Sequence, residues 1–323
     1  MSLYHYTKIS SLQSILENQE LWISHIDYMN DPQELHGGVE VFEQALNMLQ
    51  QTAQLQCGDL DNQQEPILMP FQDFKETAKK MDIFVGSFST KCNLLSQWKY
   101  YGDYAIEFDE ELIHKMANNI TKLGDTYTEV SFRTATPKGS ELNEDLVRST
   151  MQKTLKNPDF VQNNQKYSGL IKATFDNCKY ENHNMLEHAL NLLIEHIFML
   201  ADKSDKNDPL RQTENIFKKL PELYLQAALY KNKAYEEEEE KRVVILGSAG
   251  AKLSFREWNN VLLPYYKLKF PISCIKSIWV GPRDKNEQEK AKKSLEKFLK
   301  YTYMNHPNVS IPTIKLSSIP FRK

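Results

Sequence analysis

Five consecutive glutamates, Glu236 to Glu240, are separated by a single lysine from a run of strand-forming residues, RVVIL, that begins at Arg242. Extending the alternation of that strand backwards places Glu238, Glu240 and Arg242 on one face. An arginine so close to a carboxylate favours the ionised form of that carboxylate. Three ionisable groups on one strand face are costly unless the face lines a cleft. The spacing therefore predicts a catalytic carboxylate cluster, with a solvated acidic turn, the usual role of a charge run, as the alternative.

The start of the chain carries a second candidate group. Residues 2–7 contain Tyr4, His5, Tyr6 and Thr7 and are typical of a short strand. A histidine between two tyrosines is either hydrogen-bonded within a sheet or exposed in a pocket with aromatic walls. The local residues leave both interpretations open.

A third group lies where a predicted strand meets a short helix. Ser87 and Ser89 end the strand, and Trp98 and Tyr101 follow at helical spacing. Aromatic residues at that spacing usually pack in the core, which is the interpretation for Trp98. Tyr101, which precedes a glycine, could instead reach a pocket.

Asn30 stands at the start of a predicted helix that continues to about residue 56. Asp31 fits the N-cap of this helix, Pro32 its first position and Glu34 a capping box. Capping accounts for these three residues but not for Asn30, which is therefore kept as a candidate binding residue.

Strands near both ends of the chain must position these groups. The runs that predict strands lie at 2–7, 21–24, 82–89, 104–109, 243–246, 263–270, 274–281 and 308–316. On the strand at 104–109, Glu107 and Asp109 alternate with apolar residues and are expected to face solvent. Helical patterns dominate residues 182–230 and 287–301. This order predicts one α+β domain over 1–323 with a helical insertion at about 140–230.

Composition excludes several classes of protein. The chain has 323 residues and a net charge of -3, which argues against strong non-specific nucleic-acid binding but leaves room for a local basic patch. The four cysteines form no CxxC pair, so neither a zinc site nor a disulfide framework is expected. A signal peptide and a bilayer-spanning run are also lacking. We therefore expect a soluble, cytoplasmic protein without membrane contact.

Several motifs, in this order, resemble a bacterial family catalogued as domain of unknown function twenty-nine seventy-one. They are LYHYT at 3–7, LW-S at 21–24, NDP-E at 30–34, SFS with W-x-x-Y and IEFD at 87–109, K-x-x-x-Y-x-x-E-x-E-x-R at 231–242, and I-x-x-I-W-V-G-P at 275–282. The resemblance spans nearly the whole chain, although residues 110–230 match only loosely. After W-x-x-Y the family often has a turn with a histidine and a glycine, whereas GDY here leads straight to AIEFD.

The layout of that family is similar to the ADP-ribosyltransferases that use NAD. The resemblance implies a split, mixed or antiparallel β-sheet, with a histidine on the first strand, an aromatic or hydroxyl residue in the middle and a glutamate on a late strand. His5 would take the first position, Tyr101 or Ser87 the second, and Glu240, with Glu238 beside it, the third. It also implies a toxin or phage-defence effector, with a macromolecular acceptor and an antitoxin or defence partner.

The chemistry of NAD cleavage is compatible with these residues. Breaking the nicotinamide–ribose bond builds positive charge on the sugar, as glycoside hydrolysis does, and a fixed carboxylate such as Glu240 stabilises that charge. Tyr6 or Tyr101 could hold the pyridinium ring by a cation–π contact. His5 would bind a ribose hydroxyl and Thr7 the nicotinamide amide.

Two other functions stay open. A non-enzymatic module could use the same fold to bind a protein or a nucleotide. A metal-dependent nuclease using Glu238, Glu240 and Asp109 is the weaker alternative, because their spacing does not support metal ligation. NAD is accordingly expected as substrate, and no metal cofactor is expected.

Overall fold

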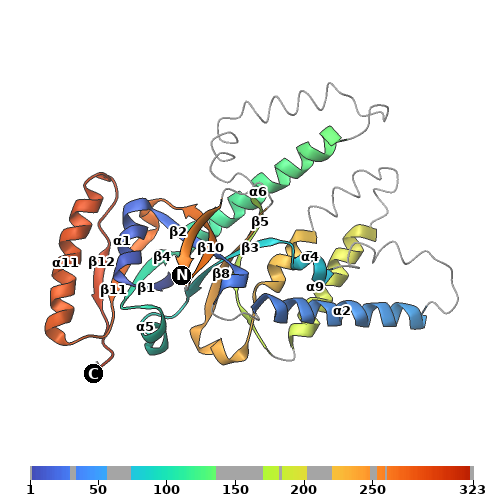
Figure 1. Ribbon diagram of the computed structural model, residues 1–323, viewed down its shortest axis with the longest axis horizontal. Coiled ribbons are helices and arrows are strands. Elements are labelled where there is room, and N and C mark those ends of the chain that lie inside the picture. Colours follow the sequence, from blue (N-terminus) through green and yellow to red (C-terminus); the bar gives the residue numbers. More distant parts are fainter. Residues whose placement is uncertain are drawn as a thin grey trace.

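The computed structural model describes residues 2–29, 34–56, 74–135, 170–181, 184–201, 220–247, 253–258 and 260–320 (Figure 1). These residues form a mixed α/β structure around one large sheet. Its strands are β1 (Ser2–Thr7), β2 (Glu20–His25), β3 (Asp82–Ser89), β4 (Tyr104–Asp109), β5 (Leu170–Asn177), β8 (Glu240–Gly247), β9 (Ser254–Trp258), β10 (Val261–Lys269), β11 (Ile275–Val280) and β12 (Thr313–Leu316). Strands β11 and β12 run parallel, and the other neighbours in this sheet are antiparallel.

Helices cover both faces of this sheet. They are α1 (Ile9–Asn18), α2 (Glu34–Gln56), α4 (Phe74–Ala78), α5 (Leu95–Tyr101), α6 (Glu110–Ala135), α9 (Asn184–Ala201), α11 (Lys285–Tyr303) and a helical segment at 220–227. Short 3-10 helices are η1 (Ile26–Tyr28), η4 (Lys233–Glu238) and η5 (Ile272–Cys274), and β6 (Lys179–Tyr180) pairs in parallel with β7 (Tyr230–Lys231). The predicted strands and the predicted C-terminal helix are confirmed to within a few residues, whereas β5 and β9 were not predicted.

Alternation of side chains along the central strands creates two apolar cores. Phe84 and Ile245 belong to a core that α1, α6 and α11 share with one face of the sheet. Val85 and Val244 belong to a second core, on the other face, which α2, α4, α9 and 220–227 complete. Figure 1 shows α11 at one end of an elongated molecule and α2, α4 and α9 at the other.

The sheet forks at β3. Strand β8 pairs with one edge of β3 along its whole length. The other edge is shared. β1 meets it only where Tyr4 lies opposite Ser89, and β2 meets it where Ser24 and His25 lie opposite Val85 and Phe84. Between these two positions, the backbone carbonyl of Ser87 accepts a hydrogen bond from Nδ1 of His5 at 3.1 Å. The His5 side chain thus provides, at the fork, the hydrogen bond that a neighbouring strand would otherwise give to Ser87. Burial lowers the pKa of His5.

Glu107 does not face solvent, which corrects the prediction made from the alternation of YAIEFD. Both faces of β4 are covered, and Glu107 is 6% exposed. Its carboxylate accepts hydrogen bonds from Ser2 at 2.8 Å, from Lys315 at 2.9 Å and from Ser277. Burial raises the pKa of Glu107, but these hydrogen bonds outweigh burial and lower the pKa to about 2.

Asp109 is the N-terminal capping residue of α6. Its Oδ1 accepts the backbone N–H groups of Glu111 at 2.9 Å and Leu112 at 3.3 Å. Asp109 also pairs with Lys276 at 3.0 Å. Its carboxylate therefore has a structural role that is sufficient to explain its presence.

The predicted helical region at about 140–230 includes strands as well as helices. Residues 136–169, 182–183 and 202–219 of that region lie outside the described residues. Strand β5 joins the large sheet by pairing antiparallel with β8. Helix α9 and segment 220–227 pack with α2. Within the described residues, no helix combines the length and apolar character needed to span a bilayer.

Two adjacent glycines near the start of α2 are expected to respond oppositely to alanine. A Cβ at Gly38 would lie 1.9 Å from the backbone oxygen of Ala227, whereas a Cβ at Gly37 would meet nothing within 4 Å. Gly38→Ala should cost about 1–3 kcal/mol of unfolding free energy because α2 must move. Gly37→Ala should add about 0.5–1 kcal/mol through helix propensity. Urea titration of both variants measures this, and equal effects would contradict the packing of α2 on 220–227.

The fork predicts a pH-dependent contribution of His5 to stability. Because the folded pKa of His5 is lowered, the unfolded chain takes up the proton first as pH falls below about 6.5, and stability decreases. His5→Gln keeps a donor but does not titrate. It should lose less stability than the wild type between about pH 7.5 and about pH 5.5. The depressed pKa values of Glu107 and Glu240 matter only at lower pH. Thermal unfolding of both proteins across this pH range measures the difference. An equal change of melting temperature with pH in the wild type and in His5→Gln would rule out this role for His5.

Candidate functional site

The glutamate run ends a 3-10 helix and begins a strand. Asn232 caps η4 by accepting the backbone N–H of Ala234 at 2.9 Å. Glu239 ends η4 in a left-handed conformation with φ of 40°, and β8 starts at Glu240. Glu238 therefore lies on η4, which corrects the prediction that the strand extends back through it. The turn nevertheless brings Glu238 and Glu240 to the same lysine.

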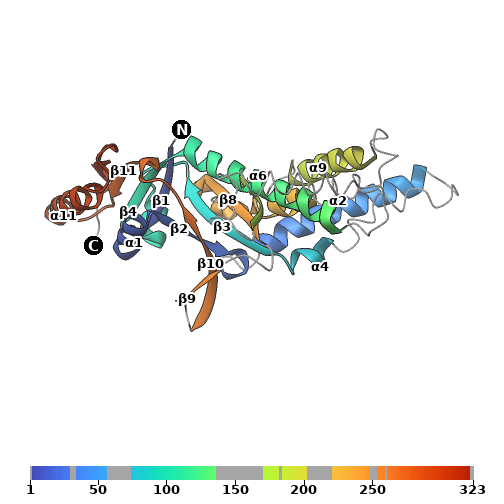
Figure 2. The ribbon, with the colours of Figure 1, turned by 90° about the horizontal axis from the view of Figure 1, so that it is seen from above.

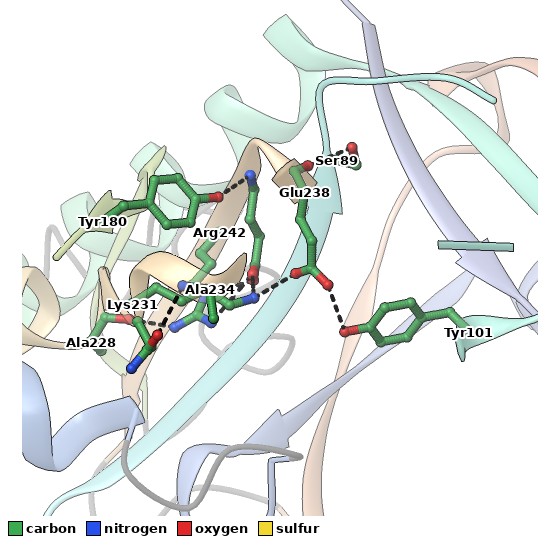
Figure 3. A network of polar contacts seen from close by, with 10 residues as sticks. Ser89, Tyr101, Tyr180, Ala228, Lys231, Ala234, Glu238 and Arg242 are labelled. Carbon is green, nitrogen blue, oxygen red and sulfur yellow. Dashed lines mark hydrogen bonds and ion pairs between the residues drawn. The ribbon is translucent and has the colours of Figure 1, made fainter. Parts of the chain in front are cut away.

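Two carboxylates and two cations form a buried ion cluster, which we define as Lys231, Glu238, Glu240 and Arg242 (Figure 3). Nζ of Lys231 donates to Oε2 of Glu238 at 2.7 Å and to Oε2 of Glu240. Nε of Arg242 donates to Oε1 of Glu240 at 2.7 Å. Nη1 of Arg242 donates to the carbonyl of Ala228 at 2.9 Å. The formal charges of the cluster sum to zero.

Burial makes this pairing obligatory. Arg242 is 0% exposed and Glu240 is 4% exposed. Burial raises the pKa of Glu240, but the charges and hydrogen bonds of Arg242 and Lys231 outweigh it and lower the pKa to about 2. Burial lowers the pKa of Lys231, and the carboxylate of Glu240 reverses this and raises it. Both groups are therefore charged at neutral pH.

Glu238 is the outer carboxylate of the cluster. Its side chain is 12% exposed, compared with 5% for Glu240. The hydroxyl of Tyr101 lies 3.4 Å from Oε1 of Glu238, so the carboxylate sits between Tyr101 and Lys231 (Figure 3). The ring of Tyr235 faces the Lys231 ammonium at 4.8 Å from the ring centroid. The outer end of the cluster thus combines the carboxylate of Glu238, the ammonium of Lys231 and two tyrosines.

Backbone contacts fix the position of both glutamates. Oγ of Ser89 donates to the carbonyl of Glu238 at 2.7 Å. The hydroxyl of Tyr180 accepts the backbone N–H of Glu240 at 2.7 Å. These contacts join the carboxylates to β3 and β6.

The neighbouring glutamates attach η4 to the segment after β3 and to the start of α5. Glu239 accepts from Thr90 at 2.9 Å and pairs with Lys91 at 2.8 Å. Glu237 accepts from Ser96 at 2.8 Å. The glutamate run is therefore divided between a buried pair and exposed residues that hold the turn in place.

Several predicted site residues lie on the same face of the sheet. Ser89 lies opposite both Glu240 and Tyr4, and Ser87 lies opposite Arg242. Oγ of Ser87 is buried and has no hydrogen-bond partner within the described residues. The structure thus brings Ser87, Ser89, Tyr101, Glu238, Glu240 and Arg242 together.

Three predicted binding residues, His5, Tyr6 and Thr7, do not contribute to this cluster as expected, and a fourth cannot be placed relative to it. The hydroxyl of Tyr6 donates to the carbonyl of Lys91 at 2.9 Å and its ring packs against Trp98, so Tyr6 supports the fold. His5 and Thr7 alternate with Tyr6 and point to the opposite face. Asn30 lies outside the described residues.

Sequence reasoning missed the roles of Lys231, Tyr180 and Tyr235. Lys231 and Tyr235 stand in the motif K-x-x-x-Y-x-x-E-x-E-x-R, and their spacing from the glutamates was the available signal. Tyr180 had no signal, because its contact with Glu240 joins residues 60 positions apart.

Metal chemistry has no geometric support in the part of the chain that the structure describes. No group of three or more histidine, cysteine, aspartate or glutamate side chains there could hold a metal ion. Asp109, which the nuclease alternative requires beside the glutamates, caps α6 instead. Both glutamates of that alternative bind protein cations.

Comparison with protein-family models, curated proteins and solved structures found no match to this chain. The resemblance to a family and to ADP-ribosyltransferases therefore remains a prediction from the motifs.

The cluster predicts a large difference between two conservative substitutions. Glu240→Gln leaves Lys231 and Arg242 buried with one carboxylate fewer, and should cost about 3–5 kcal/mol of unfolding free energy. Glu238→Gln affects a more exposed group and should cost about 1 kcal/mol. Chemical denaturation of both variants measures the difference. Equal losses of unfolding free energy in the two variants would contradict the geometry, in which Glu240 is the more buried carboxylate and the one paired with Arg242.

Proposed function

We propose that the chain consumes NAD by cleaving the bond between nicotinamide and ribose, either transferring ADP-ribose to a macromolecule or hydrolysing NAD. The observation that carries this proposal is the outer end of the ion cluster. There the Glu238 carboxylate is held by Lys231 and lies beside the Tyr101 hydroxyl. A fixed carboxylate next to an aromatic ring is the pair that this cleavage requires.

Cleavage of the nicotinamide–ribose bond requires a carboxylate that stabilises positive charge, and it does not require a general acid that protonates the leaving group. Nicotinamide leaves as a neutral molecule from a cationic ring, and positive charge develops on the ribose. A preorganised carboxylate stabilises that charge and accepts a hydrogen bond from a ribose hydroxyl. An aromatic face attracts the pyridinium ring before cleavage.

We assign the substrate-facing role to Glu238 and a positioning role to Glu240. Both carboxylate oxygens of Glu240 already accept hydrogen bonds from Arg242 or Lys231. Glu238 is the more exposed of the two and has the longer, weaker contact with Tyr101. Tyr101, which contacts Glu238, and Tyr235, which contacts Lys231, are the aromatic side chains that we assign to the nicotinamide ring. Lys231 holds the Glu238 carboxylate in place.

Two further features support the proposal. The sheet forks at β3, which agrees with the split sheet that the resemblance to ADP-ribosyltransferases implies. The late glutamate strand lies beside the middle strand that carries Ser87 and Ser89. The same resemblance supports a cytoplasmic toxin or phage-defence effector with a macromolecular acceptor and an antitoxin or defence partner.

A non-enzymatic binding module is the second candidate, and two observations favour it. His5, the expected ribose contact, points to the face opposite the ion cluster. Glu240, the expected catalytic group, is saturated by protein cations. Such a module would bind its ligand at Glu238 and Tyr101 without turnover.

Release of nicotinamide from NAD by the purified protein, with cell lysate as acceptor source, separates these functions. The wild type should release nicotinamide, and Glu238→Gln should reduce the rate by about 10²–10³-fold while the protein stays folded. Tyr101→Phe should reduce it less, because the ring is kept.

Glu236→Gln is the matched control, because Glu236 is an exposed member of the same run. This variant should release nicotinamide at the wild-type rate. A folded wild type that releases none, or a Glu238→Gln variant as active as the control, would favour the binding module. Calorimetric titration with NAD then shows whether the nucleotide binds without turnover.

A further inference from the structure

Strand β9 and the adjoining part of β10 form a hairpin at the end of the large sheet. β9 is the last strand in the sheet order and pairs only with β10 among the described residues. Figure 2 shows this hairpin projecting from the body of the molecule. Large side chains are exposed on and beside it, including Trp22 at 40% and Trp258 at 48%. None of these residues belongs to the ion cluster.

One face of the hairpin carries a row of aromatic rings with a cation between two of them. The register places Trp22 opposite Lys267, and Arg256 opposite Leu263, so these side chains share a face. The Trp22 ring lies 4.5 Å from the Tyr265 ring, centroid to centroid. The Arg256 guanidinium lies 5.7 Å from the Trp22 ring and 5.9 Å from the Trp258 ring.

Among the residues that the structure describes, Arg256 has no anionic partner. Its Nη2 donates to Oγ of Ser24 at 3.2 Å, and its Nε is buried with no hydrogen-bond partner among the described residues. No carboxylate in the part of the chain that the structure describes forms an ion pair with it. Burial lowers the pKa of Arg256. A ligand that brings a negative charge to this position would compensate the guanidinium.

We propose that this row, defined as Trp22, Arg256 and Trp258, binds single-stranded nucleic acid. The two exposed tryptophans each stack against a base, and the phosphate group that links the two nucleotides contacts Arg256. Exposed aromatic rings with arginine between them are the elements of sequence-tolerant single-strand binding. The proposal is independent of NAD consumption, because it uses a different part of the sheet.

The charge of the chain limits how this binding works. With a net charge of -3, the protein cannot attract nucleic acid over its whole surface, so stacking must supply most of the affinity. Glu20 lies 3.7 Å from both Lys267 and Lys269, which reduces their effect on phosphates. Arg256 is therefore the main phosphate contact. Binding should depend only weakly on salt, with a log–log slope of about -0.7 for one phosphate.

Fluorescence anisotropy with a labelled oligothymidylate of about twelve nucleotides tests the proposal. The full chain should bind this single strand more tightly than a duplex of equal length, because duplex bases cannot stack on the tryptophans. Trp258→Ala should weaken binding by at least about fivefold and keep the salt slope. Arg256→Gln should weaken binding and flatten the slope.

Phe255→Ala provides the matched control. Phe255 is 59% exposed on the same strand but points to the opposite face, next in sequence to Arg256. This variant should bind as the wild type does. The proposal is overturned by a folded wild type that does not bind, by a preference for duplex, or by equal losses in Phe255→Ala and Trp258→Ala. It is also overturned if size exclusion shows a dimer that Trp258→Ala dissociates while oligonucleotide binding is absent, since the row would then be a protein interface.

Discussion

The ion pair between Arg242 and Glu240 is the interaction on which the surrounding architecture depends. A fully buried guanidinium must satisfy its donors within the protein, and here it uses one glutamate and the carbonyl of Ala228. That requirement fixes the end of the 220–227 helix against β8. Lys231 extends the pairing to Glu238 and so determines where η4 ends. The helical layer, the small β6–β7 sheet and the glutamate turn therefore meet around one buried charge.

Side chains alternate between the two faces of the sheet, and only residues on the same face can belong to one site. The cross-strand register joins Glu240, Ser89 and Tyr4 on one face, and this is a property of pairing rather than of distance along the chain. His5 belongs to the other face, where its ring donates to a carbonyl that no strand reaches. The histidine that suggested a nucleotide pocket thus has a sufficient structural explanation, and chemical interest moves to Glu238 and Tyr101.

Local pattern predicted much of the fold and part of the site. β1, β3, β4 and α11 follow from runs of aromatic and β-branched residues and from helical periodicity. The approach of Glu238 to Glu240 was predicted from strand alternation, but the left-handed turn at Glu239 produces it. Glu107 was misplaced because alternation cannot show that a strand is covered on both faces. The fork and the contact of Tyr180 with Glu240 depend on partners far away in sequence. Such pairings are set by packing of the whole chain, which no short window contains.

The fork at β3 also has a consequence for synthesis on the ribosome. Ser89, at the end of β3, bonds to Glu238 across 149 positions of the chain. The early strands β1 and β2 cover only parts of one edge of β3, so its other edge has no partner until β8 has been translated. Non-local pairing of this kind folds slowly and late. A nascent chain thus carries no completed carboxylate cluster before Arg242 has been translated, and whatever chemistry the cluster performs begins only after that point.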